Sequence, residues 1–315
     1  MKVLRGQNLR VLEFNYSGDM KATVIAKATN CVVTLNTTAG DVTTKDVVGN
    51  ASKPRITSKG WTVQVDSLDV ASLEHFMRLV LNGTKLGLMF DRVATADNQS
   101  PTSDENGIGR YGDAIVTDLK FNFNDRDYSS FNVQFTGSGA LSTSEEAQAN
   151  VIDVDDNYVK GQFIRLFLSD TTNPNSPIAA AKQLSFHASV QTENITTKDV
   201  TDDWDEFEVV GISYDISSNA LVYTGDDASL LSNAMNLQGL IVHYEDEDLM
   251  YWEIAKVSGT HNRVKGDKLL SGQAWITQVT VNAQNRQTTN YTIQLSGYGA
   301  FTAYAYVAPT PTPSH

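Results

Sequence analysis

The sequence predicts a mainly β fold made of two tandem units, each a sandwich-like or barrel-forming sheet with one helix. Three observations support this fold class: an internal repeat, apolar–polar alternation in four stretches of each half, and one helical pattern per half. We place the first unit at 1–141, a linker at 142–158, the second unit at 159–308 and a flexible tail at 309–315.

The internal repeat consists of four blocks that recur in the same order. Residues 5–11 resemble 160–166, the sequence Thr-Thr-Lys-Asp-Val occurs at 43–47 and 196–200, and Ala-Ser-Leu occurs at 71–73 and 228–230. The longest block, 114–141, aligns without gaps to 274–301. One such match could arise by chance, but four in order indicate a tandem duplication. The intervening linker is polar and acidic, and the Pro-Thr-rich end is typical of an extended tail.

Four stretches in each half alternate apolar and polar residues, which is typical of a strand with one buried face. They cover 31–35, 61–65, 119–123 and 131–135 in the first unit, and 184–188, 212–216, 279–283 and 291–295 in the second. From this register we expect these side chains to be buried: Trp61, Val63, Val65, Phe121, Phe131, Val133 and Phe135.

One helical pattern lies between the second and third strands of each unit. The apolar positions with helical spacing are Leu73, Phe76, Met77 and Val80 in the first unit, and Leu230, Leu231, Ala234 and Leu237 in the second. We expect a short apolar strand after each helix, at 86–90 and 240–244. Each helix is predicted to cover the apolar face of its sheet.

The other sheet face is predicted to be polar with few charges, whereas an ordinary solvated sheet carries more Lys and Glu. It is either a solvated face of biased composition or a smooth wall that hydrogen-bonds water and offers phosphate no cation. The residues assigned to this face are Thr62, Gln64, Asp66, Asp118, Asn122, Asn132, Gln134, Ser213, Asp215, Gln278, Asn282 and Gln294.

The charge and cysteine content exclude several classes of protein. A net charge of −13 and a pI near 4.7 disfavour tight nucleic-acid binding, because an acidic chain repels phosphate. The single cysteine, Cys31, permits no disulfide within the chain. We find no apolar signal-peptide core and no stretch long enough for a membrane helix, so we expect synthesis in a reducing cytoplasm and no membrane partner.

No catalytic, metal or cofactor site is predicted. The five histidines show no metal-ligand spacing, and no Gly-x-Ser-x-Gly motif is present. The acidic run at 153–157 lacks the glycine and terminal glutamate of a calcium-binding EF-hand loop. We interpret the acidic run at 245–248 as an exposed sheet edge that deters aggregation. The chain is therefore expected to be non-enzymatic.

Several of these features, taken in order, resemble the tail tube (major tail) protein family of long-tailed phages. They are the Gly6-Gln-Asn-Leu-Arg opening, the Ile25-Ala-Lys-Ala-Thr-Asn entry into the first strand, the polar segment ending in Gly60-Trp-Thr-Val-Gln-Val-Asp, the helix with its short strand, and the segment from Gly112-Asp-Ala-Ile to Phe135-Thr-Gly-Ser-Gly-Ala-Leu. The resemblance covers most of the first unit and, more weakly, most of the second. This chain departs from the commonest one-domain form because it carries two units.

The resemblance implies a structural virion protein that polymerises into stacked rings around a channel for DNA. The polar residues would then face the lumen. The implied partners are further copies of the chain and other tail proteins, namely the tape measure, terminator and baseplate or tip proteins. The segments 36–59 and 189–206 are long for links between adjacent strands, and are either loose loops or arms that contact the next ring. The residues assigned to ring stacking are Thr43, Lys45, Asp46, Thr196, Lys198 and Asp199.

Duplication predicts how many chains make a ring. Three chains with two units each would form a homotrimeric ring with pseudo-six-fold symmetry, whereas the rival is six chains with one unit of each outside the wall. We favour the trimer because both units keep the uncharged polar face. Two other functions remain open: a β-sandwich adhesin or receptor-binding module, and a tail-terminator or head–tail completion protein.

Overall fold

The computed structural model describes fourteen segments of the chain: residues 9–14, 21–25, 27–41, 54–68, 72–92, 109–125, 127–143, 148–150, 159–172, 174–196, 204–222, 234–258, 264–285 and 287–305. The first half contains β1 (Leu9–Phe14), β2 (Lys21–Val24), β3 (Ala28–Asp41), β4 (Pro54–Ser67), α1 (Leu73–Asn82), β5 (Leu86–Arg92), β6 (Arg110–Asn124), β7 (Ser130–Gly137), β8 (Ser142–Thr143) and β9 (Gln148–Asn150). The second half contains η3 (Gly161–Phe163), β10 (Ile164–Ser169), β11 (Ser176–Pro177), β12 (Ala181–Asn194), β13 (Phe207–Leu221), α3 (Leu237–Glu245), β14 (Leu249–Ser258), β15 (Val264–Asn282) and β16 (Asn290–Ala303).

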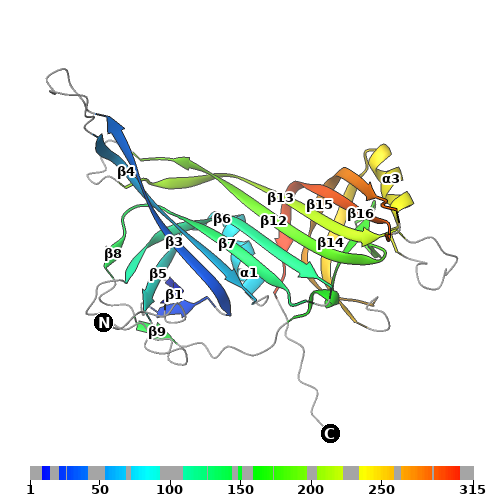
Figure 1. The fold of residues 1–315 in the computed structure, drawn as a ribbon, viewed down its shortest axis with the longest axis horizontal. Helices are drawn as coiled ribbons and strands as arrows, with labels where there is room; N and C mark the ends of the chain where they lie inside the picture. Colours follow the sequence, from blue (N-terminus) through cyan, green and yellow to red (C-terminus); the bar gives the residue numbers. More distant parts are fainter. Residues whose placement is uncertain are drawn as a thin grey trace, which may run out of the picture.

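All the strands belong to one sheet, which confirms the mainly β fold class. Its main run is β3-β4-β7-β6-β12-β13-β16-β15, so the two halves of the chain lie side by side and join through β6 and β12. The run is visible in Figure 1, with β3 and β4 at one end and β14 to β16 near α3 at the other. Two branches leave the run, β5-β1-β2 from β6 and β14-β10-β11 from β15.

The core lies on one face of the main run, in the predicted register. The seven side chains expected to be buried are all fully covered. In the second half, Leu184, Phe186, Ile216, Ile293 and Leu295 continue the same apolar face. The alternation of buried and exposed residues along β4 and β7 shows that hydrophobic burial sets this register.

The two halves share several backbone irregularities. Three register shifts in the first half, at Ala28/Asn30, Thr38/Ala39 and Val116/Asp118, recur at Ala181/Gln183, Gln191/Thr192 and Ile276/Gln278. The described residues with positive φ also form three pairs: Lys27 with Ala180, Gly83 with Glu247, and Gly139 with Gly299. Bulges and left-handed residues are local devices that shape a strand or a helix end. The two halves therefore have matching strands and helix ends, although the exact unit boundaries stay a prediction.

An aromatic side chain in each half packs under a pair of glycines. A Cβ at Gly137 would lie 2.1 Å from the Trp61 ring, and one at Gly112 would lie 2.9 Å from it. In the second half Tyr214 takes the same place, 2.4 Å from a Cβ at Gly297 and 3.1 Å from one at Gly272. The Trp61 indole donates to the Gly139 carbonyl at 3.2 Å, and the Tyr214 hydroxyl donates to the Gln273 carbonyl at 2.5 Å. Glycine is required at these strand positions because the ring occupies the space of a side chain.

The helix prediction is confirmed in the first half and corrected in the second. Leu73, Phe76, Met77 and Val80 form the buried stripe of α1, and β5 follows it. In the second half the helix is α3, so Leu237 is its first residue, Ala234 precedes it, and 240–244 is helical rather than a strand. Leu230 and Leu231 lie outside the described residues. The Asn236 side chain accepts from the Gly239 amide at 2.9 Å and starts α3 at this point.

Three further expectations also change. Residues 36–41, 54–59 and 189–194 of the two long segments are strand, because β3 pairs with β4, and β12 with β13, beyond the alternating stretches. These threonine-rich extensions pair across the hairpin without apolar alternation. The linker contains β8, paired with β6, and β9, paired in parallel with β2. The acidic run at 245–248 is the end of α3 and the turn after it, not a sheet edge, and His243 there lies 2.8 Å from Asp248.

Candidate functional site: the polar sheet face and its two outer edges

The polar residues predicted to form a wall do lie together. They project from β4, β6, β7, β13, β15 and β16 on the side opposite the core, so one polar face crosses both halves. Half-buried members are Thr62, Asp66, Asp118, Asn122, Asn132 and Gln134, and exposed members are Gln64, Ser213, Asp215, Gln278, Asn282 and Gln294. That this face lines a lumen stays a prediction.

Hydrogen bonds between strands hold much of this face. Asp66 accepts from the Asn132 side-chain amide at 2.5 Å and from that of Asn30 at 3.1 Å. In the second half Asn219 donates to the Thr292 hydroxyl at 3.0 Å. Carboxylates that already accept hydrogen bonds are held in place, and uncharged amides and hydroxyls present both donors and acceptors to water. The face is therefore suited to contact water rather than to bind one charged ligand.

His187 is a member of this face that the sequence reasoning missed. It lies on β12, directly across from Lys120 on β6. Its Nε2 atom is 2.6 Å from Asp118 Oδ2, and its Nδ1 atom is 4.0 Å from Asp215 Oδ2. The available signal was its polar position between Phe186 and Ala188 in the alternating stretch. His187 thus links the polar faces of the two halves where they meet.

Beneath His187, the two halves share a continuous apolar seam. In the register of β6 and β12, Phe121 lies across from Phe186, Leu119 from Ala188 and Phe123 from Leu184. All six side chains are buried. Phe186 also stacks on Tyr214 with ring centroids 5.8 Å apart and meets Trp252 at the same distance. The junction is therefore core packing and backbone pairing combined, not a loose contact between domains.

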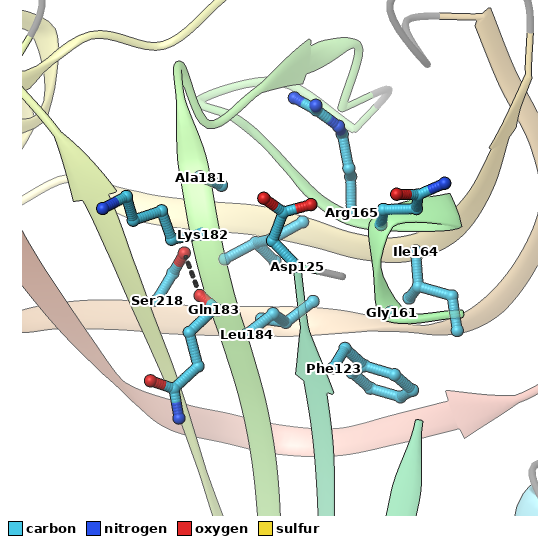
Figure 2. Close-up of a pocket in the computed structure, with 12 residues that line it drawn as sticks. Phe123, Asp125, Gly161, Ile164, Arg165, Ala181, Lys182, Gln183, Leu184 and Ser218 are labelled. Atoms are coloured by element: carbon cyan, nitrogen blue, oxygen red, sulfur yellow. Dashed lines mark hydrogen bonds between the residues drawn. The ribbon is translucent and has the colours of Figure 1, made fainter. Parts of the chain in front are cut away.

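A small pocket of about 100 Å³ lies at one end of this junction. Figure 2 shows Phe123 and Leu184 at its base with Asp125, Lys182 and Arg165 around it. Ser218 donates to the Gln183 carbonyl at 3.1 Å, which ties β13 to β12 at the pocket wall. The lining mixes opposite charges and polar backbone without a catalytic grouping. We assign this pocket to the packing of the junction.

The main run ends in two outer edges. Among the described residues, β3 pairs only with β4, so its other side is open. At the far end, residues 276–282 of β15 pair with β16 alone, whereas the earlier part of β15 also pairs with β14. An open edge exposes unpaired backbone N–H and C=O groups and can accept another strand. These two edges and the polar face between them make up the candidate site.

Most of the residues assigned to ring stacking cannot be placed. Thr43, Lys45, Asp46, Lys198 and Asp199 lie outside the described residues. Thr196 is exposed just beyond β12; its hydroxyl accepts from the Glu206 amide at 2.8 Å and its amide donates to Asn194 Oδ1 at 2.9 Å. Both hairpins extend toward the same side of the molecule in Figure 1. Their role in stacking stays a prediction.

Within the described part of the chain, no His, Cys, Asp and Glu side chains cluster in a way that could hold a metal ion. The same part contains no helix with the length and apolar character needed to span a membrane.

The chain was compared with known proteins. No family model matches it, and no curated protein matches it significantly. A chain from the tail of an empty gene transfer agent (GTA) particle, computed with C6 symmetry, is 14% identical with a TM-score of 0.36, over 47% of this chain and 99% of that one. A chain from the native GTA virion is 14% identical with a TM-score of 0.33, and the match covers 47% of this chain and 99% of that one. A chain from the six-fold symmetrised baseplate of the anti-feeding prophage is 10% identical with a TM-score of 0.28, and the match covers 44% of this chain and 91% of that one. At these TM-scores the likeness is too weak to assign the chain to a family.

Proposed function

We propose that this chain is a non-enzymatic structural protein that polymerises into stacked rings, forming the hollow tail tube of a phage or phage-like particle. One observation carries the proposal: the two halves pair side by side through β6 and β12, so that one sheet presents an unbroken polar face on one side and the core on the other. A wall for a channel requires this arrangement, because strands must continue from unit to unit while one face stays wet.

Three chains would close such a wall. The main run has eight strands per chain, so three chains supply about 24 strands and six similar units. The rival ring of six chains places one unit outside the wall. The paired β6 and β12 disfavour it, since both halves of one chain already belong to the same sheet. Closure also pairs the two outer edges, which would otherwise promote aggregation.

The polar face supports a role in the passage of DNA. Its charged members include three aspartates and one cation, Lys120, and most of the others are uncharged amides and hydroxyls. DNA phosphates bind to lysine and arginine through release of counterions, and each contact adds to affinity at low salt. A face with few cations lets DNA slide without being held.

The first test is electron microscopy of the purified protein. The proposal predicts long hollow tubes, or rings with a central channel. Isolated rings that never stack would favour a terminator or completion protein, and monomers at high concentration would favour a binding module. Either result would contradict the tube.

The lumen is tested by adding cations to the polar face. Replacing Gln64, Asn122, Gln134 and Gln294 by Lys should leave folding and assembly intact, because these side chains are half-buried or exposed. DNA delivery by particles carrying this variant should fall, most strongly at low salt. A matched variant with the same four residues replaced by Ser should deliver DNA normally. Equal delivery by both variants would show that this face does not line the channel.

Stacking of rings is tested by shortening the segment between β3 and β4. Shortening the segment between β3 and β4, which contains Thr43, Lys45 and Asp46, should leave rings intact and abolish long tubes. The motive is that the Thr-Thr-Lys-Asp-Val sequence is repeated, once between β3 and β4 and once between β12 and β13 in the sequence. Tubes of normal length from this variant would show that the tip does not join rings.

A further inference from the structure

The strands that join the two halves each have a counterpart in the other half of the chain. At the internal junction, residues 183–189 of β12 pair antiparallel with residues 124–118 of β6, from Gln183 across Asn124 to Ser189 across Asp118. The counterpart of β12 is β3, the counterpart of β6 is β15, and both counterparts lie at the outer edges.

Backbone markers fix the correspondence residue by residue. The shift at Ala28/Asn30 in β3 matches that at Ala181/Gln183 in β12, so residues 30–36 correspond to 183–189. The shift at Val116/Asp118 in β6 matches that at Ile276/Gln278 in β15, so 118–124 corresponds to 278–284. The partner strands agree, because Phe186 pairs with Ile216 as Val33 pairs with Val63.

We propose that β3 of one chain pairs antiparallel with the end of β15 of a second copy and with the two residues that follow it, residues 30–36 against 284–278. In this register Val33 lies across from Val281, Thr34 from Thr280 and Cys31 from Ala283. The inference rests on the proposed function and deepens it by naming the partner strands and their register. Because the two edges differ, each contact is head-to-tail, and such contacts build a closed ring when the rotation between copies closes.

Side-chain exposure supports this pairing. Leu35 on β3 is 64% exposed and Val281 on β15 is 46% exposed, although both project toward the core face. Their counterparts at the internal junction, Ala188 and Phe121, are 0% exposed. The same positions are therefore covered where a neighbouring strand is present and open where it is absent. Pairing the edges would bury a continuous apolar row, and burial of apolar surface favours association.

The composition of the two edge segments also fits pairing. Residues 30–36 and 278–284 contain no charged residue, no proline and no glycine, and each segment has two valines and one threonine. Strands that stay at an open edge usually carry lysine, proline or a protective bulge. In the proposed register three polar pairs form, as where Thr34 meets Thr280, whereas Val32 meets Asn282, and no like charges face each other.

Contacts beside the internal junction point to the same arrangement. There, a Cβ on Gly83 at the end of α1 would lie 3.0 Å from Val209, and Ser138 donates to the Phe207 carbonyl at 3.5 Å. The counterparts of Val209 and Ser138 are Ile56 and Tyr298, which are both exposed apolar side chains. In the proposed ring Ile56 of one chain packs near the end of α3 of the next chain. This gives exposed side chains on both sides of the seam a partner.

A single substitution tests the register, because Cys31 is the only cysteine. In the variant Ala283→Cys, the new thiol lies directly across from Cys31 of the next chain, at a spacing that a disulfide or a short bifunctional thiol-reactive crosslinker can bridge. Burial raises the pKa of the Cys31 thiol, so oxidation is run at about pH 9 to populate the thiolate. We expect covalent dimers and trimers on denaturing gels, with no larger species.

Two controls sharpen the test. Asn282→Cys moves the thiol one residue along β15 and to the other sheet face, so it should crosslink at least tenfold less. Adding Cys31→Ser to Ala283→Cys should abolish the crosslink. A second pair, Thr34→Cys with Thr280→Cys in a Cys31→Ser background, probes the same register on the polar face. It reports on the seam even where Ala283→Cys impairs folding.

Electron microscopy of the same samples separates this inference from the proposed function. Crosslinked trimers that form no tubes would support the seam and contradict the tube. Rings or tubes without a crosslink in either pair, or with equal crosslinking from Asn282→Cys, would overturn the register and leave the tube standing. Crosslinks that extend beyond trimers would overturn the closed three-chain ring.

Discussion

The junction between β6 and β12 and the two outer edges are built from corresponding strands, yet they differ in burial. At the junction Phe121 and Phe186 face each other within the core, and His187 closes the polar side against Asp118. At the edges Val33 and Val281 correspond to those phenylalanines, and Thr34 corresponds to His187. The side chains that meet at the internal junction are large and partly charged, whereas the corresponding side chains at the outer edges are small and uncharged.

The same kind of strand pair thus serves two purposes: one pair joins the halves within a chain, and the other is proposed to join neighbouring chains. A junction inside a chain forms during folding and can bury large aromatic rings from the start. An outer edge must remain soluble until a second copy arrives, so it exposes smaller side chains and keeps its polar face uncharged. Exposed valine and leucine side chains are tolerated singly, but a row of them marks an interaction surface.

The largest expected effect comes from placing a lysine at corresponding positions. Ala188→Lys puts a charge into the buried junction and should cost more than about 4 kcal/mol, enough to unfold most of the protein. Leu35→Lys puts the charge at the exposed edge, so the stability of the monomer should change by less than about 0.5 kcal/mol while ring assembly is lost. Urea unfolding and light scattering measure the two effects. Rings of normal size from Leu35→Lys would contradict the difference between junction and edge.

The next effect concerns the polar side of the junction. His187→Ala removes the contact with Asp118 and should destabilise the chain by about 1 kcal/mol, since both side chains are partly exposed. The corresponding edge variant, Thr34→Ala, should leave the stability of the monomer unchanged. Denaturant midpoints of the two variants, measured side by side, provide the check. Equal midpoints would show that the His187 contact contributes nothing to joining the halves.

A smaller effect should appear when charges are placed across the proposed seam. Thr34→Lys with Thr280→Glu puts opposite charges directly across from each other, and Thr34→Lys with Thr280→Lys puts like charges there. Cross-strand pairs of this kind are worth roughly 0.2–1 kcal/mol, which corresponds to at most about fivefold in each chain–chain contact. Ring dissociation on dilution should rank the opposite-charge variant as tighter. If the like-charge variant formed the tighter ring, Thr34 and Thr280 would not face each other across the seam.

The smallest effect is a pH dependence at a contact between β1 and α1. Glu13 on β1 lies 2.7 Å from His75 on α1, and this hydrogen bond raises the pKa of His75 above its usual value. A raised folded-state pKa means that the stabilisation is fully present below about pH 6.5 and is lost as the pH rises through the raised pKa. Because both groups are partly exposed, the size stays below about 1 kcal/mol. His75→Gln should flatten the change in unfolding free energy between pH 5.5 and pH 8, whereas ring assembly should not change. An unaltered pH profile would rule out this contact.

Much of the core could be predicted from the sequence, because burial of one sheet face produces alternation. Trp61, Val63 and Val65 show that pattern directly, and the stripe from Leu73 to Val80 shows the helical period. The second helix was misplaced because the apolar side chains of α3 do not form a clear stripe and Leu230 and Leu231 offered a better period. Asn236 was the usable signal, since asparagine at this position caps a helix.

The candidate site was predictable in part. Alternation placed residues such as Gln64 and Gln134 on one polar face, which the structure confirms. The pairing of β6 with β12 could not be predicted, because backbone hydrogen bonds between strands leave no mark in the sequence beyond compatible patterns. For the same reason His187 was not recognised as a link between the halves. The extended hairpins were missed because their outer strand residues are mostly polar and show no clear alternation.

The most direct test of the account is the number of chains in one ring. Native mass spectrometry of disassembled tubes, or a cryo-EM reconstruction of the intact tube, measures it. The continuous sheet through β6 and β12 predicts three chains per ring, a wall of about 24 strands and three-fold symmetry. A ring of six full-length chains would contradict it, because half of the units would then lie outside the wall.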